Sequence, residues 1–435
     1  MSATLLGFAG FVCALVMIAF GLPVAVAMGV VGTAGFWWLN GWSGAAFILG
    51  SSPFEAIFPY SLSVIPLFVM MGVFAARAGL SRSLFDMVTS FLGHVRGGLA
   101  VTAVGACAIF GAICGSSLAT VATMGRVAIP EMRSRGYADS LSSASIAAGG
   151  TLGVLIPPSI LLVIYGILTN TSIGQLFIGA IIPGIVGAVL YGLAIVVRVA
   201  ITPDLAPQTP RMAWRHRLST IRRVWGVVLL FSLVIGGIYL GWFSPTEAAA
   251  VGAVGAFALA LLSGEMDRQA LWSSVTETAA LTGMIFFILI GASLFNYFLE
   301  TTGVPAALIA AIKDTGLGPL AVLLLIIAFY VVLGCFMDSM SMILLTVPFL
   351  APVAVEMGYD MVWFGIIVVT VAEIGLITPP IGMNLFVVQS TVPGITQRTV
   401  IAGILPFILA DFVRLTVIVA LPILTLWLPS RMFVG

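Results

Sequence analysis

Long apolar runs without a charged side chain constrain this chain more than any other feature. Positions 175–197 and 225–241 contain no Asp, Glu, Lys or Arg, and each run approaches the roughly 20 residues that an α-helix needs to cross a membrane. The runs are continuous rather than alternating between polar and apolar residues, which argues against barrel strands. Because backbone polar groups in lipid must be paired within the chain, helices remain. The sequence therefore predicts an all-α polytopic membrane protein.

The composition agrees with this interpretation. Charged residues make up 8% of the 435 positions, against roughly a quarter in an ordinary soluble domain, so a water-facing surface could not be covered. The segment from Met1 to Phe20 lacks a basic start and leads into another apolar run, which predicts a retained span rather than a signal peptide. Ten spans are predicted, at roughly 5–21, 23–39, 57–77, 140–168, 175–197, 225–241, 245–263, 274–299, 362–391 and 399–428.

The two halves of the chain share a pattern at one constant spacing, the one that separates Pro23 from Pro245. The other matching positions are Pro130 and Pro352, Gly136-Tyr137 and Gly358-Tyr359, Gly153 and Gly375, and Pro157-Pro158 and Pro379-Pro380. Several matches at one spacing, two of them dipeptides, argue against chance alignment of abundant Gly and Pro. They predict an internal repeat.

Basic residues predict the orientation, because Lys and Arg collect in cytoplasmic loops. The Arg-rich segment 201–224 is therefore expected to be a cytoplasmic connector between the repeats. Arginines also flank the interrupted apolar region 98–130 on both sides, which predicts a re-entrant hairpin that opens to the cytoplasm. The matching region 319–352 is followed by the acidic Glu356 and Asp360 and is expected to open to the outside.

This topology gives each repeat five spans plus one hairpin. Because the number of crossings is odd, the second copy is inverted relative to the first. The first repeat would occupy 1–200 and the second 225–435, with both termini outside the cytoplasm. Inverted repeats with broken elements near the midplane of the membrane are typical of secondary transporters.

Other classes of function lack their sequence signals. No Walker A run, His-Glu-x-x-His motif or Gly-x-Ser-x-Gly motif occurs, which argues against an enzyme. Lys313 is the one lysine, and no basic stripe is present to bind nucleic acid. The four cysteines lie in apolar stretches, as packing residues do.

Two pairs of segments carry the candidate chemistry. The hairpins turn at 111–117 and 334–339, and each repeat has a span in which glycines precede a double proline. Proline removes a backbone donor and disfavours helix in the residue before it, so these spans are expected to unwind. Freed carbonyls and a hydroxyl suit a small hard cation such as Na⁺, and the freed helix N-termini suit a substrate carboxylate. The alternative is that the prolines merely kink a helix.

Three charged residues near these segments are candidates for a functional role. Asp338 and Glu373 could hold a cation or orient unwound backbone, because intramembrane carboxylates are costly and usually functional. The alternative for both is a hydrogen-bonded structural carboxylate. Arg126 could bind a substrate carboxylate or could snorkel to the membrane surface.

At these segments the sequence resembles a known family. Gly115-Ser116-Ser117-Leu118-Ala119-Thr120, Ile129-Pro130-Glu131-Met132 and the run 153–159 are similar to motifs of the large membrane subunit of tripartite ATP-independent periplasmic (TRAP) transporters, as are Thr346-Val347-Pro348 and the run 375–386. The resemblance covers essentially the whole chain. Arg126 departs from the family, which more often has a small residue there.

The resemblance implies a function and a set of partners. It implies a Na⁺-coupled importer of organic acids such as C4-dicarboxylates or sialic acid, in a bacterial inner membrane. The expected fold is that of the ion-transporter superfamily, with an elevator mechanism. A small four-helix membrane subunit and a periplasmic substrate-binding protein would complete the system.

Motif position, through this resemblance, also implies the site residues. The first Na⁺ would lie among Gly115, Ser116, Thr151, Val154 and Pro157, and the second among Gly334, Asp338, Glu373, Gly375 and Thr378. Substrate would contact Ser117, Ser339, Pro158, Pro380 and Arg126. Two alternatives stay open: a stand-alone Na⁺/carboxylate carrier, and a membrane scaffold without transport activity.

Overall fold

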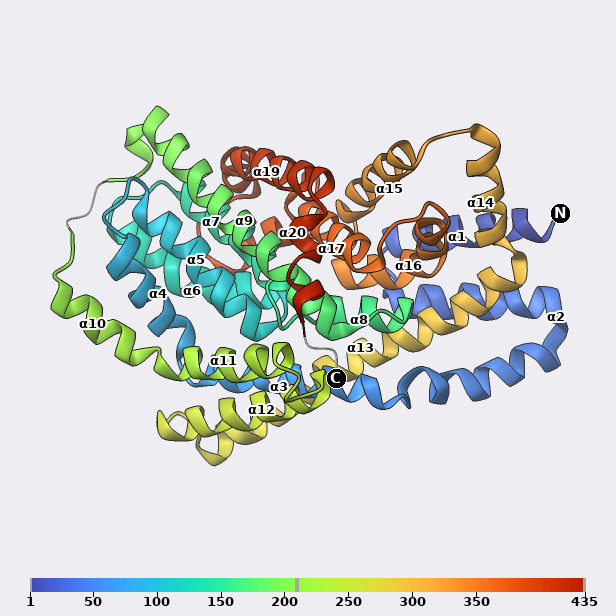
Figure 1. Cartoon of the computed structure of the whole chain (residues 1–435), viewed down its shortest axis with the longest axis horizontal. Helices are drawn as coiled ribbons and strands as arrows, with labels where there is room; N and C mark the ends of the chain where they lie inside the picture. Colours follow the sequence, from blue (N-terminus) through green and yellow to red (C-terminus); the bar gives the residue numbers. More distant parts are fainter. Residues whose placement is uncertain (1, 208–210, 433–435) are drawn as a thin grey trace.

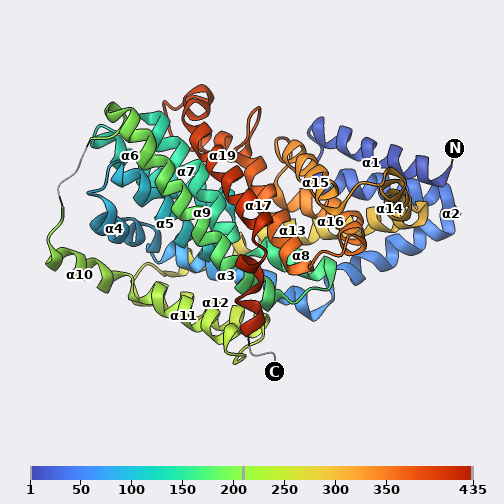
Figure 2. The same cartoon turned by 45° about the horizontal axis from the view of Figure 1, so that its top comes forward.

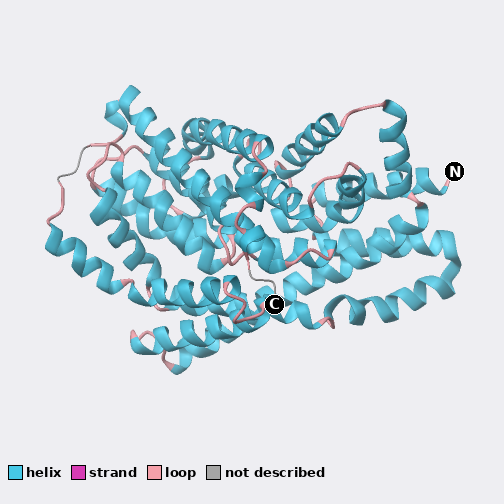
Figure 3. Ribbon diagram, viewed as in Figure 1, coloured by secondary structure: helices cyan, strands magenta, loops and turns pink. Residues whose placement is uncertain are grey.

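The computed structural model describes residues 2–207 and 211–432. Within these ranges the chain is helical and contains no strand, as predicted (Figure 3). The helices of the first half are α1 (Ala3–Ala19), α2 (Val24–Ile57), α3 (Val64–Arg77), α4 (Leu80–Leu92), α5 (Gly98–Cys114), α6 (Ser117–Ser134), α7 (Asp139–Leu155), α8 (Ile160–Thr169) and α9 (Ile173–Ile201).

The connector contains one helix, α10 (Trp214–Arg223), and its residues 208–210 lie outside the described ranges. The helices of the second half are α11 (Trp225–Tyr239), α12 (Pro245–Leu262), α13 (Arg268–Thr302), α14 (Val304–Thr315), α15 (Pro319–Gly334), α16 (Ser339–Glu356), α17 (Met361–Ile377), α18 (Met383–Thr391), α19 (Gln397–Ala420) and α20 (Ile423–Leu426). Short 3₁₀ turns lie at Tyr60–Ser63, Pro203–Leu205 and Pro429–Arg431.

The helix bounds recur at the spacing of the sequence repeat. α16 begins and ends at the counterparts of the first and last residues of α6, and α17 stands in the same relation to α7. The contacts recur as well: α7 packs on α19 as α17 packs on α9, and α8 packs on α16 as α18 packs on α6. The opposite insertion of the two halves in a membrane stays a prediction.

The observed helices match most of the predicted spans. In the described part of the chain, seven helices are long and apolar enough to cross a membrane, and up to nine if each of two bent helix pairs counts as one span. Two predicted spans fall outside this set: α1 has 17 residues, and the span at 362–391 is divided into α17 and α18. The hairpin arm α16 also meets the length criterion, although its residues are mostly buried in the protein.

Both hairpins are longer than predicted. The second arms end at Ser134 and Glu356, one turn beyond Pro130 and Pro352, and both prolines lie inside their helices. The predicted regions 98–130 and 319–352 ended at these prolines, which cannot donate a backbone hydrogen bond. One missing bond does not stop a helix when its last turn packs against neighbours.

The helices form two groups. The hairpins α5–α6 and α15–α16 pack on α7, α8, α17 and α18, and α9 and α19 join this group. The second group contains α1, α2, α3, α11, α12 and α13. Most of it runs along the lower side of the molecule in Figure 1, whereas α1 lies above α2 in that view and at the upper right in Figure 2. We call these the hairpin group and the outer group.

The two longest helices hold the outer group together. α2 is interrupted at Gly41, whose φ of 76° lies in the left-handed region, and α2 contacts α13 on both sides of this break. Before the break, a Cβ at Gly291 of α13 would lie 2.3 Å from the carbonyl oxygen of Ala25, so the two backbones touch. After it, the Ser52 hydroxyl donates a hydrogen bond of 2.9 Å to Ser293. Close backbone contact of this kind is how helices associate in lipid.

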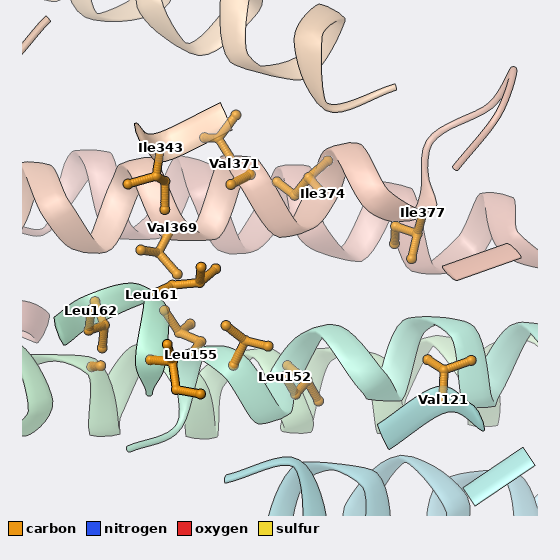
Figure 4. Close-up of a cluster of buried hydrophobic side chains, with 14 of the residues drawn as sticks. Val121, Leu152, Leu155, Leu161, Leu162, Ile343, Val369, Val371, Ile374 and Ile377 are labelled. Atoms are coloured by element: carbon orange, nitrogen blue, oxygen red, sulfur yellow. The ribbon is translucent and has the colours of Figure 1, made fainter. Parts of the chain in front are cut away.

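The core of the hairpin group lies between the two broken spans. Figure 4 shows Leu152 and Leu155 of α7 on the side that faces Val369 of α17, with Leu161 of α8 beside them. All of these side chains are buried. Because lipid is as apolar as leucine, packing rather than removal from water stabilises this contact. α7 is rich in Ser, Ala and Gly, which lets its neighbours approach closely.

Candidate functional site

Each hairpin tip is the start of a helix. α5 ends at Cys114, Gly115 follows with φ +67°, and the Ser116 side chain accepts a hydrogen bond of 3.4 Å from the Ala119 amide at the start of α6. In the second hairpin Asp338 accepts a hydrogen bond of 3.0 Å from the Ser341 amide at the start of α16. Both tips therefore direct backbone N–H groups, and the positive end of a helix, toward the middle of the molecule.

Asp338 has a structural role at this tip. Its carboxylate also accepts a hydrogen bond from the Ser341 hydroxyl, so it caps α16 with both oxygens. Ser116 caps α6 at the matching position. Asp338 is thus hydrogen-bonded within its own hairpin, while its side chain stays half-exposed.

The double prolines interrupt both spans, as predicted. α7 ends at Leu155 and α8 begins at Ile160, with extended backbone at Ile156 and Ser159 between them. α17 ends at Ile377 and α18 begins at Met383. The peptide bond between the two prolines is cis in each break. The prolines differ in exposure: Pro157 and Pro158 are buried, Pro379 is half-buried and Pro380 is exposed.

Glycines place each hairpin against its broken span. A Cβ at Gly153 would lie 2.3 Å from the Cα of Gly111, and a Cβ at Gly375 would lie 2.4 Å from the Cα of Gly334. These distances are shorter than any side chain tolerates, so backbone meets backbone at both crossings. The crossings bring the hairpin tips to the depth of the breaks.

A buried polar cluster lies where the two tips meet. The Ser339 hydroxyl donates a hydrogen bond of 2.7 Å to Oε1 of Glu373. The side-chain amide of Asn384 donates hydrogen bonds of 2.8 Å to the Ser117 hydroxyl and 2.9 Å to the carbonyl of Ala147. The Ser117 hydroxyl lies beside the Glu373 carboxylate, whose Oε2 atom has no hydrogen-bond partner. Ser117 and Ser339, which are counterparts in the sequence repeat, therefore both lie next to one carboxylate that is 1% exposed.

Asn384 is a member of this cluster that the sequence did not assign. Its side chain is fully buried, and its Oδ1 atom has no hydrogen-bond partner. The sequence did contain a signal for Asn384, because a side-chain amide inside an apolar segment is energetically costly in a membrane unless it has a partner.

Thr151 faces a different set of partners. Its hydroxyl donates a hydrogen bond of 2.7 Å to the carbonyl of Ala148 and lies 3.2 Å from the hydroxyl of Tyr191. Tyr191 donates a hydrogen bond of 2.6 Å to Asp411, which is paired with Arg414 at 2.8 Å. The sequence assigned no role to Tyr191 or Asp411.

Of the other predicted site residues, Arg126 lies apart from the tips. It is exposed on α6, nine residues after Ser117, and its Nε donates a hydrogen bond of 3.2 Å to the carbonyl of Ala122 in its own helix. Nine residues correspond to about 13 Å along a helix. Thr378 lies at the end of α17, where its hydroxyl donates a hydrogen bond of 2.7 Å to the carbonyl of Ile374. Val154 is buried in α7 near Gly111 and Gly153.

Three cavities lie away from the tips. A cavity of about 380 Å³ lies between α2, α8 and α13, and one of about 330 Å³ is apolar and lies between α1, α13, α14, α15 and α16. A third, of about 780 Å³, lies beside the loop between α8 and α9. None of these three cavities is lined by a residue of the two hairpin tips.

The polar groups at the tips could hold a hard cation. It consists of hydroxyl, amide, carboxylate and carbonyl oxygens. In the described ranges no group of three His, Cys, Asp or Glu side chains could hold a metal ion. Oxygen ligands of this kind suit a hard cation better than a transition metal.

Comparison with known families decides the classification. Residues 11–424 match the model of the tripartite ATP-independent periplasmic transporter, DctM component. The chain belongs to this family. It is a TRAP transporter large permease and a transport protein rather than an enzyme, because its curated relatives are permease subunits.

Several relatives match over most of this large permease. A C4-dicarboxylate TRAP transporter large permease protein, DctM, from Pseudomonas aeruginosa is 38% identical over 90% of this chain and 93% of its own length. An ectoine TRAP transporter large permease protein, TeaC, from Halomonas elongata is 32% identical over 95% of this chain and 96% of its own. An isethionate TRAP transporter permease protein, DctMQ, from Oleidesulfovibrio alaskensis is 32% identical, and the match spans 92% of this chain and 63% of the relative.

The fold is shared with more distant membrane transporters. The YdaH transporter of Alcanivorax borkumensis superposes with a TM-score of 0.65 at 14% sequence identity, covering 98% of both chains. MtrF of Neisseria gonorrhoeae superposes with a TM-score of 0.60 at 13% identity, covering 97% of this chain and 95% of its own. At such identity the likeness concerns the fold alone.

Proposed function

We propose that this large permease imports organic acids with Na⁺ as the coupling ion and with help from a binding protein. The observation that carries the proposal is the meeting of the two hairpin tips, through Ser117 and Ser339, on the buried carboxylate of Glu373. Broken helices and hairpin tips that meet inside a membrane protein are the usual site of substrate and coupling ions in secondary transporters.

The proposed ion sites use the backbone at both breaks. The first Na⁺ binds among Gly115, Ser116, Thr151, Val154 and Pro157. The second binds among Gly334, Asp338, Glu373, Gly375 and Thr378. Carbonyls freed by the interruption of α7 and α17 support both sites, because unpaired carbonyls inside a membrane protein need a partner.

The proposed substrate site lies between the tips. Ser117 and Ser339 begin α6 and α16, so a substrate carboxylate there faces two helix N-termini. Pro158 and Pro380 flank this position at the two breaks. Arg126 is left out of the proposed site, because it is exposed and distant along α6. The relatives named for C4-dicarboxylate, sialic acid and ectoine support a small organic solute.

An elevator mechanism fits the two helix groups. The hairpin group contains all residues of the proposed site, and the outer group packs along one side of the hairpin group. We propose that the hairpin group moves across the membrane while the outer group stays fixed. The first repeat would comprise 1–200 and the second, inverted repeat 225–435, joined by the connector 201–224.

The proposed partners are a small four-helix membrane subunit and a periplasmic substrate-binding protein. The DctMQ relative supports the small membrane subunit. That relative is longer than this chain, and the match covers 63% of its length. The multi-pass chain would lie in a bacterial inner membrane with both termini in the periplasm.

The test is uptake by proteoliposomes that contain the whole system. Uptake of a radiolabelled organic acid should collapse when external Na⁺ is replaced by K⁺ at the same ionic strength. Equal uptake in both cations contradicts Na⁺ coupling. Uptake by this chain alone, without a binding protein, would instead favour the stand-alone carrier, and no uptake with any partner would favour the scaffold.

A further inference from the structure

Three charged side chains are buried in the described part of the chain, and only one of them lies at the hairpin tips. The three are Glu373, Asp411 and Arg414, each no more than 1% exposed. Asp411 and Arg414 lie on α19 and pair at 2.8 Å. Charges at membrane depth are expensive, and a buried ion pair by itself rarely offsets the loss of hydration. The pair therefore calls for an explanation beyond stability.

The pair is joined to the first broken span by hydroxyl groups. Asp411 uses its second oxygen, Oδ2, to accept a hydrogen bond of 2.6 Å from Tyr191 of α9. The Tyr191 hydroxyl lies 3.2 Å from the Thr151 hydroxyl. Because Tyr191 gives its own proton to Asp411, the Thr151 proton is shared between the Tyr191 oxygen and the carbonyl of Ala148, which lies 2.7 Å away. The Arg414 guanidinium lies 6.0 Å from the centre of the Tyr191 ring. A continuous polar path thus runs from α19 through α9 to α7.

The surrounding helices leave room for this path. A Cβ at Gly187 of α9 would lie 2.5 Å from a guanidinium nitrogen of Arg414. A Cβ at Gly403 of α19 would lie 2.0 Å from the carbonyl oxygen of Ser140 in α7. α19 is therefore held against α7 by backbone contact at one level and by the polar path at another.

Thr151 lies one turn before the break in α7. Ile156, where the extended backbone begins, follows five residues later. A change in the position of Thr151 therefore moves the carbonyls of Val154 and Pro157, which the proposed function assigns to the first ion.

We propose that Asp411, Arg414 and Tyr191 form a positioning network that holds the end of α7, through Thr151, in the geometry required for ion binding. None of these three residues touches the ion or the substrate. The Thr151 hydroxyl acts as the anchor of this network, and the ion uses main-chain carbonyls of the following residues. The identity of the ion rests on the proposed function. The positioning of α7 by this network does not depend on which ion binds.

The test compares two buried tyrosines in the purified permease with its small subunit in nanodiscs. Tyr191→Phe removes the hydrogen bond to Asp411. Tyr330→Phe is the matched control, because Tyr330 is also buried and accepts a hydrogen bond of 2.6 Å from Thr346 in the second hairpin. Hydrogen exchange measured without Na⁺ should increase at least tenfold in the peptide covering 149–156 in the first variant and stay unchanged there in the second.

Na⁺ itself is the second probe. The Na⁺ concentration that gives half-maximal thermal stabilisation, with K⁺ as the reference cation, should rise about tenfold in Tyr191→Phe and in Thr151→Val. The double variant Tyr191→Phe/Thr151→Val should need no more Na⁺ than either single variant, because the effects of coupled residues do not add. Thr151→Ser should restore the wild-type value, since it keeps the hydroxyl.

The outcomes separate the two proposals. Unchanged exchange at 149–156 in Tyr191→Phe, or additive shifts in the double variant, would overturn the positioning network. Absence of any Na⁺-specific stabilisation in the wild type would contradict the proposed function. In that case, hydrogen exchange at 149–156 that is faster in Tyr191→Phe but unchanged in Tyr330→Phe would still support the network.

Discussion

At the scale of single residues, the cluster at the hairpin tips is the feature with the most consequences. Glu373 is almost fully buried and receives a hydrogen bond from Ser339 of the second hairpin, while Ser117 of the first hairpin lies beside it. One carboxylate thereby links two elements that belong to different halves of the chain. A buried carboxylate that loses a donor is costly, so each serine matters to the whole cluster.

Ser339→Ala should weaken Na⁺-dependent uptake. The change removes the donor of the 2.7 Å hydrogen bond to Glu373 and leaves this carboxylate less satisfied. We expect the Na⁺ concentration for half-maximal uptake to rise by about tenfold, since a buried polar group that loses its hydrogen-bond partner costs about 1–3 kcal/mol. Ser142→Ala is the control, because Ser142 is equally buried but donates only to the carbonyl of Ala138 in its own helix. A similar rise in both variants would contradict a specific role for Ser339.

At the scale of elements, two backbone crossings place the hairpins. Gly111 meets Gly153, and Gly334 meets Gly375, at separations that exclude a Cβ. The broken spans supply one partner of each crossing and a hairpin arm supplies the other. The geometry of the proposed ion sites therefore depends on the absence of side chains at a few helix positions.

Gly153→Ala should destabilise the protein. The added Cβ would lie 2.3 Å from the Cα of Gly111, and backbone cannot yield as a flexible side chain can. Overpacking of this kind costs about 1–3 kcal/mol, which should lower the apparent melting temperature of the purified permease by several degrees. At Gly283 of α13 nothing lies within 4 Å of an added Cβ. Gly283→Ala should therefore leave the melting temperature unchanged or raise it, because alanine favours helix over glycine. Equal melting temperatures for the two variants would argue against a tight crossing.

At the scale of the whole molecule, the two halves repeat the same arrangement of helices. The bounds of α6 and α7 recur in α16 and α17, and the packing partners recur with them. The distribution of basic and acidic loops predicts that the second half is inserted upside down relative to the first. Alternating access by rigid movement of one helix group depends on this inversion.

Labelling from one side of the membrane tests the inversion. Ser134 and Glu356 are the last residues of α6 and α16, are counterparts in the sequence repeat and are exposed. In a Cys13→Ser background, which removes an exposed native thiol, Ser134→Cys should react with an impermeant maleimide only after the cell is opened. Glu356→Cys should react in whole cells with a permeabilised outer membrane. Labelling of both cysteines from the same side would contradict the inverted repeat and with it the proposed mechanism.

The sequence predicted the elements well where local chemistry decides. Apolar runs located most spans, and the double prolines located both breaks, because a missing backbone donor acts on its own segment. The lengths of the hairpin arms were predicted less accurately. Both hairpin arms continue past Pro130 and Pro352, since packing by neighbours supports one more turn.

The sequence by itself determined the helical fold, the repeat and the interruptions, because each follows from the properties of neighbouring residues in lipid. Only the tertiary structure decided which polar groups meet. Asn384 and Ser117 are 267 residues apart and share a hydrogen bond, and Thr151 faces Tyr191 rather than a hairpin tip. Such partners are selected by how helices pack, and a polar side chain in an apolar run indicates only that some partner must exist.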